Sequence, residues 1–155
     1  GKAWLSPRAG GFRIIGTVWR ARQRREGRGA TVLFSSRQFV DVIVAAPAGR
    51  INHSSAGELE GALAPLLEQT PSGKGGLVLD FAAVDYISSV GLRLLMVAAK
   101  QMRARNARIA VAALQPVVAE IFAISRFDSV LEVFPSVRDA VAKLSPAALA
   151  SFDAQ

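Results

Sequence analysis

The stretch LVLDFAAVDYISSVGLRLL, residues 77–95, decides the fold of this chain. It begins with a continuous apolar run, Leu77–Phe81, which is typical of a strand buried on both faces. A short loop with two adjacent serines, Ser88 and Ser89, follows, and a helical apolar pattern starts at these serines. Hydroxyl groups at a helix N-terminus, just after a sheet strand, are placed to accept a phosphoryl group or to meet a partner. The stretch therefore suggests a regulatory switch.

Strands and helices alternate on both sides of this stretch. Upstream, β-branched and aromatic residues predict two antiparallel strands, Thr31–Phe34 and Phe39–Ala46, the second of which ends at Pro47 and Gly49 before a short extended piece, Arg50–Ile51. The other predicted elements, in chain order, are a helix from an N-cap at Asn52–Ser55 to Gln69, a helix Ser89–Ala104, a strand Arg108–Leu114, a helix from Gln115 and Pro116 to Ile124, a strand Val130–Phe134 and a helix Ser136–Leu144 capped by Ser136. Short links between alternating elements imply βαβ units. We therefore expect an α/β fold with a central, mixed, mainly parallel sheet of about four or five strands and about four helices.

The helix after the serines has a broad apolar face. We expect a buried stripe on this helix, formed by Leu92, Leu95, Met96 and Ala99 and widened by Leu94, Val97 and Ala98. Arg93 and Lys100 then face solvent or a partner. Gly91, in the first turn, is expected to allow another backbone to approach closely.

Basic residues are concentrated at the start of the chain. Residues 1–38 contain nine basic side chains and one acid, a formal charge of +8, whereas residues 39–155 contain ten basic groups and eleven acids. The globular part therefore has no basic bias that would indicate direct nucleic-acid binding. We expect a basic N-terminal extension over residues 1–30, a globular domain over residues 31–146 and a C-terminal tail over residues 147–155. The extension is either an incidental tail or an arm that contacts nucleic acid, an anionic membrane, an acidic partner or a second copy of the chain.

Composition argues against several kinds of chemistry. The chain has no cysteine, which excludes disulfides, thiolate catalysis and Cys-ligated zinc, and its one histidine, His53, argues against a serine-hydrolase triad. Asp80 and Asp85 have no third ligand nearby, so we predict no catalytic residue, no metal and no cofactor. Apolar runs are shorter than the roughly 18–20 residues of a membrane span, and the patch Phe12–Trp19 lacks a signal-peptide pattern. We therefore expect a cytoplasmic protein that is not an enzyme.

The order of these motifs resembles the STAS domain, the fold shared by anti-sigma-factor antagonists and by the cytoplasmic parts of sulphate transporters. The resemblance covers residues 39–144. It rests on the GRIN turn at Gly49–Asn52, the LVLDF strand, the segment DYISSVGLR and the later segment RIAVAALQPVVAEIFAISRFD, in that order.

The resemblance implies a phosphorylation site. In the antagonists, a serine just before the second helix is phosphorylated by an anti-sigma factor that is also a protein kinase, and the matching residue here is Ser89. Ser88 is the alternative acceptor, because it stands where the family often has Asp. Asn52 stands where the family's G-E-L-D turn has its Asp, so it keeps a hydrogen-bonding side chain and removes a charge. Capping is the other interpretation of Ser89, since a serine at a helix start stabilises the helix by roughly 0.5–2 kcal/mol relative to Ala.

We therefore expect an anti-sigma factor antagonist that binds a serine-kinase anti-sigma factor, is switched off by serine phosphorylation and is restored by a phosphatase. The expected partner-binding residues are Asn52, His53, Ser88, Ser89, Val90, Gly91, Arg93 and Lys100. Two alternatives stay open. One is a STAS subunit of a membrane lipid or anion transport complex that is not phosphorylated, and the other is an adaptor that acts through the basic arm, where a homodimer contact would also form.

Overall fold

The computed structural model describes residues 33–155. The expectations for residues 1–32, namely the basic extension, its homodimer contact and the start of the strand predicted at Thr31, lie outside the described residues. In the described part, the strands are β1 (Leu33–Phe39), β2 (Val42–Ile51), β3 (Gly76–Asp80), β4 (Ala83–Ile87), β5 (Ile109–Ala112) and β6 (Glu132–Phe134). The helices are α2 (Ala56–Gln69), α3 (Ser89–Ala104), α4 (Pro116–Ile124), α5 (Val137–Leu144) and α6 (Pro146–Asp153), with a 3-10 helix, η2 (Phe127–Ser129), before β6.

The sheet is mixed and mainly parallel. Its order is β1-β2-β3-β5-β6, and β4 pairs with β2. β1 is antiparallel to β2, whereas the pairs β2–β3, β2–β4, β3–β5 and β5–β6 are parallel. Residues 33–155 thus form a six-stranded sheet with five α-helices. The predicted fold class is confirmed, with more strands and helices than expected.

β2 is longer than predicted because it continues through Pro47. Residues 42–45 of this strand pair with β3 and residues 48–51 pair with β4, so Pro47 lies between the two partners on that side. A proline usually interrupts a sheet, because it has no N–H to donate to the neighbouring strand. At a gap between two partner strands no such hydrogen bond is needed, so proline is tolerated there. The prediction that the strand ends at Pro47 and Gly49 was therefore wrong, and Arg50–Ile51 is the end of β2.

The segment between Phe81 and Ser88 contains a strand where a loop was predicted. β4 pairs with the second half of β2 and buries Val84 and Ile87. The bend between β3 and β4 starts at Asp80, whose Oδ1 accepts a 3.0 Å hydrogen bond from the backbone N–H of Ala82. Because a strand this short is stabilised by a partner far back in the sequence, its own residues give little sign of it.

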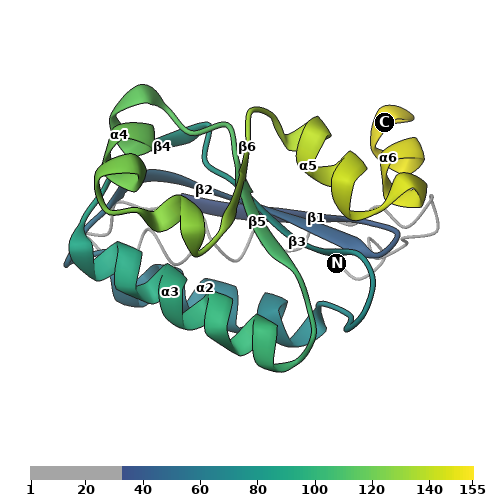
Figure 1. Cartoon of the computed structure of the whole chain (residues 1–155), viewed down its shortest axis with the longest axis horizontal. Helices are drawn as coiled ribbons and strands as arrows, with labels where there is room; N and C mark the ends of the chain where they lie inside the picture. Colours follow the sequence, from purple (N-terminus) through teal and green to yellow (C-terminus); the bar gives the residue numbers. More distant parts are fainter. Residues whose placement is uncertain (1–32) are drawn as a thin grey trace.

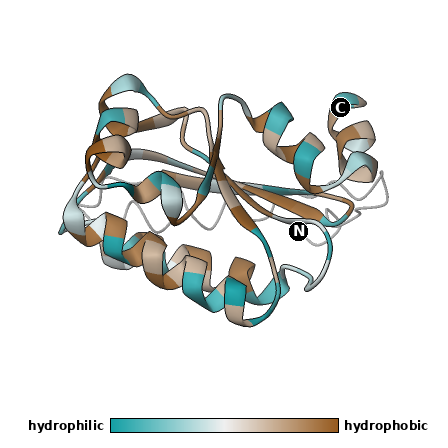
Figure 2. Ribbon diagram, in the orientation of Figure 1, coloured by the Kyte–Doolittle hydropathy of each residue, from teal (hydrophilic) through white to brown (hydrophobic). Residues whose placement is uncertain are grey.

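Helices cover both faces of the sheet. α2 and α3 lie side by side on one face, and α5 and α6 lie on the other (Figure 1). The larger core joins α2, α3 and α4 to the strands, and the smaller core joins α5 and α6 to them. The central strands are predominantly brown in Figure 2, in agreement with the complete burial of β5 between the two layers. The site described below lies where the layer of α2 and α3 meets the ends of β2 and β4.

Several predicted helices have the expected bounds. α3 and α4 occupy Ser89–Ala104 and Pro116–Ile124, and the Ser136 Oγ at the start of α5 accepts a 3.1 Å hydrogen bond from the N–H of Asp139. The segment 147–155, expected as a tail, contains most of α6. The ring of Phe152 in α6 packs edge-on against Phe39, with 5.3 Å between ring centroids. α6 thus belongs to the layer that covers the second face of the sheet.

Candidate partner-binding site

The carboxyl ends of β2 and β4 lie together. Ile51 and Ile87 are register partners at the ends of these parallel strands, and the carbonyl oxygen of Ile51 accepts a 2.8 Å hydrogen bond from the N–H of Ser88. The turn that begins at Asn52 and the serine pair therefore emerge side by side from the sheet. Two segments that the sequence analysis assigned to one partner-binding site are thus brought together by a strand pairing that it did not predict.

Ser88 is the N-cap of α3. Its backbone is extended, and its Oγ accepts a 3.2 Å hydrogen bond from the N–H of Gly91. This bond satisfies one of the backbone donors that every helix leaves free in its first turn. The capping role considered for Ser89 therefore belongs to Ser88, which is partly buried.

Ser89 is the first residue of α3 and is exposed. Within residues 33–155, its hydroxyl forms no hydrogen bond, while the neighbouring cap is already supplied by Ser88. A modification of this hydroxyl would therefore leave the cap of the helix in place. It would also place the modifying group beside the free N–H groups and the positive dipole end of α3.

Asn52 and Ser55 build the turn opposite the serines. The Asn52 Oδ1 accepts hydrogen bonds from the backbone N–H groups of Ser54 and Ser55, at 3.0 and 3.2 Å. The buried Ser55 hydroxyl donates to the carbonyl oxygen of Arg50 at 2.7 Å and accepts from the N–H of Asn52 at 3.0 Å. The Asn52 side chain thus shapes a turn that presents His53 and Ser54 to solvent. A neutral amide suffices for these hydrogen bonds, so the turn forms without a carboxylate at position 52.

Gly91 is buried where α3 leaves the sheet. A Cβ at this position would lie 2.7 Å from Ile51 Cγ2 and 2.8 Å from Ile87 Cγ1. The expected close approach is therefore real, but it comes from two side chains at the strand ends and not from another backbone. Gly91 sets how closely α3 approaches the ends of β2 and β4, and it offers no surface to a partner.

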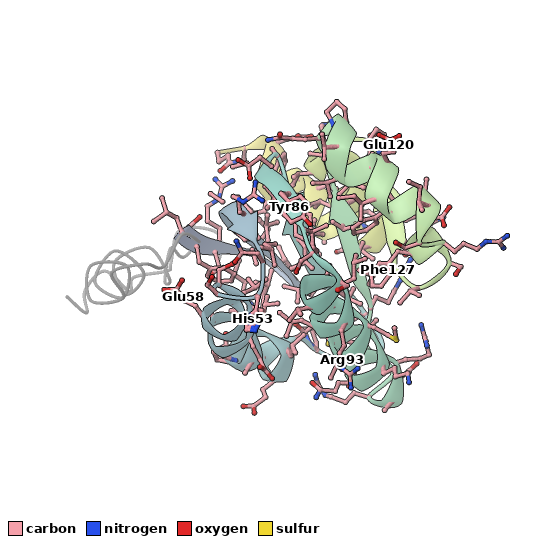
Figure 3. The ribbon with its side chains drawn as sticks, turned by 90° about the vertical axis from the view of Figure 1, so that its left-hand side faces the viewer. His53, Glu58, Tyr86, Arg93, Glu120 and Phe127 are labelled. Carbon is pink, nitrogen blue, oxygen red and sulfur yellow. The ribbon has the colours of Figure 1, made fainter. Side chains whose placement is uncertain are left out.

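Arg50 and Tyr86 are a feature of the site that the sequence analysis missed. These residues are register partners in β2 and β4, and the Arg50 guanidinium carbon lies 4.4 Å from the centroid of the Tyr86 ring. The Tyr86 side chain is labelled near the strand ends in Figure 3. Such a cation–π pair fixes the direction of a charged side chain near the site. Only the pairing of β2 with β4 reveals it, so no pattern in the sequence could have indicated it.

A groove runs from this site along α2 and α3. Its volume is about 340 Å³. The lining residues are His53, Ala56, Gly57 and Glu60 on one side and Val90, Arg93, Leu94 and Val97 on the other. The groove includes three of the predicted partner-binding residues, His53, Val90 and Arg93, and the first and last of these are labelled in Figure 3. Lys100 is exposed further along α3 and does not line the groove.

Two residues of the predicted buried stripe are exposed. Met96 and Val97 have exposed fractions of 37% and 43%, whereas the buried positions of α3 are Gly91, Leu95, Ala98, Ala99 and Met102. α2 and the sheet cover only one side of α3, so a helix that is apolar over a wider arc leaves part of that arc in solvent. The predicted width of the stripe was therefore wrong. Met96 and Val97 are an exposed apolar surface of α3, and Val97 lines the groove.

Within residues 33–155, His, Asp and Glu side chains form no group of three that could bind a metal ion. No helix in the same range is both long and apolar enough to cross a bilayer.

Comparison with known proteins identifies the family. The STAS domain profile matches residues 34–140, and this chain belongs to the STAS domain family. It is 38% identical over 111 residues to BtrV of Bordetella bronchiseptica, whose provisional name is anti-sigma factor antagonist, and the match covers 72% of this chain and 86% of BtrV.

Two solved structures show the same fold. An anti-sigma factor antagonist from Mycobacterium paratuberculosis has a TM-score of 0.66 at 23% identity, covering 74% of this chain and 94% of that one. The antagonist SpoIIAA in its unphosphorylated form has a TM-score of 0.57 at 15% identity, covering 71% of this chain and 94% of that one.

Proposed function

We propose that this chain is an anti-sigma factor antagonist that acts by reversible protein binding and is not an enzyme. In the unphosphorylated state it binds an anti-sigma factor with serine-kinase activity in the cytoplasm and so releases a sigma factor for transcription. Phosphorylation of Ser89 ends the binding, and a phosphatase restores it. The 38% identity to BtrV, a relative with this provisional name, supports the class of function. The observation that carries the switch is the exposed Ser89 hydroxyl, free beside a cap that Ser88 supplies.

The switch acts in the interface and leaves the fold unchanged. A phosphoserine carries about −1.5 to −2 charges at neutral pH. The N-terminus of α3 tolerates this charge, because its free N–H groups and dipole favour an anion. A partner surface that packs over the neutral loop would instead meet a buried dianion. A loss of only about 1.4 kcal/mol already weakens binding tenfold, so one phosphate buried in the interface has a large effect on the affinity.

The proposed partner surface surrounds Ser89. Asn52 shapes the turn, His53 is exposed on it, and Ser88 and Gly91 fix the start of α3. Val90, Arg93 and Lys100 are exposed on the same helix. We assign direct contacts to the exposed residues and a positioning role to Asn52, Ser88 and Gly91.

A kinase assay tests the proposal. The anti-sigma factors of the source genome that contain a serine-kinase-type ATPase domain are purified, and each is incubated with the chain and ATP. Mass spectrometry of the peptide that contains Ser88 and Ser89 should show one phosphate, on Ser89. An unmodified peptide with every kinase, while each kinase modifies an established antagonist, would overturn the switch. Stable co-purification with a transport complex and with no anti-sigma factor would favour the transport-subunit alternative.

A further inference from the structure

The groove between α2 and α3 extends the serine site along the two helices. Val90 and Val97 contribute apolar surface on the α3 side and have exposed fractions of 42% and 43%. Met96, beside Val97 in the chain, is also exposed. Exposed apolar side chains that line a concave surface are typical of a binding site for a partner. The opening of about 340 Å³ is large enough for a few side chains of a ligand.

The two walls of the groove carry opposite charges. Glu60 lines the groove on α2, and Arg93 lines it on α3. Beyond the groove, about two turns further along each helix, Glu68 and Lys100 repeat the same charges. Within residues 33–155, neither Glu60 nor Arg93 forms a hydrogen bond or an ion pair. These charges are therefore available to a ligand that is acidic on the side of α3 and basic on the side of α2.

Gly57 lines the α2 wall of the groove, and Gly61 lies further along the same helix. A Cβ added at either position would meet no heavy atom within 4 Å, so packing within the chain does not require glycine there. Both residues are exposed and lie one turn apart on the same face of α2. Glycine weakens a helix relative to alanine, so the fold alone gives no reason for glycine at these positions. A ligand backbone that comes close to α2 would supply one.

We propose that this groove binds an α-helix of the anti-sigma factor. Apolar side chains of that helix contact Val90 and Val97, its acidic side chains face Arg93, and its backbone approaches Gly57. An amphipathic helix fits because it presents apolar residues at i, i+3, i+4 and i+7 between two polar edges. The inference rests on the proposed function, since it states which part of that partner occupies the site and in which orientation.

Binding of the kinase-type anti-sigma factor identified by the kinase assay tests the shape of the groove. Gly57→Leu fills the groove at a position with open space, so the variant should fold and should bind at least tenfold more weakly than the wild type. The matched control is Ala119→Leu, which adds the same side chain at an exposed position of α4. Glu120, the next residue in α4, lies far from His53 and Arg93 in Figure 3. Equal affinities for Gly57→Leu and the wild type, with circular dichroism unchanged, would overturn the inference.

A charge swap tests the orientation. The double variant Glu60→Arg with Arg93→Glu keeps the net charge and reverses the polarity of the groove. It should bind at least tenfold more weakly than the wild type. The difference in affinity should be larger at low salt, where charge–charge interactions are screened least. Retained affinity would show that polarity plays no part and would overturn the proposed orientation.

Cross-linking identifies the occupant. Because the chain has no cysteine, Glu60→Cys introduces a single attachment point for a photo-cross-linker, and Glu120→Cys provides the control on α4. Cross-links from position 60 should reach residues of the anti-sigma factor spaced three or four apart within one helix. Cross-links to a second copy of this chain, or a dimer that Gly57→Leu dissociates in light scattering, would overturn the choice of occupant. If no kinase-type anti-sigma factor binds the wild type, the proposed function itself fails; if one binds and the groove variants bind equally well, only the groove inference fails.

Discussion

The N–H of Ser88 donates a 2.8 Å hydrogen bond to the carbonyl oxygen of Ile51. This bond continues the β2–β4 pairing by one residue beyond the strands, to the point where α3 begins. The two hydroxyl groups of the serine pair therefore have different surroundings. The Ser88 Oγ accepts a hydrogen bond from the N–H of Gly91, whereas the Ser89 hydroxyl is exposed. Adjacent residues of the same type thus have separate tasks.

The division of tasks predicts unequal effects on stability. Ser88→Ala removes the N-cap of α3 and should lower the free energy of unfolding by about 0.5–2 kcal/mol. Ser89→Ala removes no hydrogen bond within the described residues and should change it by less than about 0.5 kcal/mol. Urea unfolding followed by circular dichroism measures both. An equal loss in the two variants would contradict the assignment of the cap.

The same division predicts the reverse order for partner binding. Ser89→Asp places a negative charge in the proposed interface and should weaken binding to the anti-sigma factor tenfold or more, whereas Ser89→Ala should bind like the wild type. Ser89→Asn is the control, because it has the shape of Asp without its charge. Isothermal titration calorimetry measures the three affinities. If Asp and Asn weaken binding equally, the effect is steric and the charge-based switch is wrong.

Gly91 and Gly61 should respond to alanine in opposite directions. At Gly91 the new Cβ would lie 2.7 Å from Ile51 Cγ2, so Gly91→Ala should force α3 away from the strand ends and cost about 1–3 kcal/mol of stability. At Gly61 the Cβ meets no heavy atom within 4 Å, so Gly61→Ala should stabilise α2 by up to about 1 kcal/mol. Thermal unfolding of both variants checks the signs. A stabilised Gly91→Ala would mean that the helix approaches the strands less closely than described.

α6 should contribute to stability through Phe152. The ring is partly buried and packs edge-on against the fully buried Phe39. Phe152→Ala should lower the free energy of unfolding by about 1–3 kcal/mol, less than the loss of a fully buried ring. Phe152→Leu retains much of the apolar contact and should lose less. If both variants unfold like the wild type, the C-terminal segment is dispensable, as a tail would be.

The sequence predicts α3 and α4 to their ends because their signals are local. A pair of serines starts one helix and Pro116 starts the other, and both helices have apolar periodicity. β4 and the passage of β2 through Pro47 depend on strand pairing between distant segments, which no local pattern reports. For the same reason, only the family resemblance predicts that His53 and Ser89 belong to one site. In the structure, the hydrogen bond between Ser88 and Ile51 joins the two segments that carry these residues.

The groove between α2 and α3 could not be predicted from the sequence, although several of its lining residues were. Val97 has the periodicity of a core residue, and its exposure depends on how much of α3 the neighbouring α2 covers. That coverage is a property of two packed helices and not of either sequence pattern. Gly57 gives no local signal either. In the sequence, a glycine within a helix indicates only a weak helix former, and only the structure shows the open space around it.

The division of β2 between two partners implies two levels of protection against hydrogen exchange. Residues 42–45 are held by β3 in the middle of the sheet, whereas residues 48–51 are held by β4, a short strand whose pairing contains a register shift at Gly49 and Arg50. We therefore predict that the amides of β4 exchange faster, through local opening, than those of β3, which exchange only on global unfolding. If this difference is measured, the end of the sheet that leads to Ser89 opens on its own and can adjust to a bound protein while the centre of the sheet stays closed.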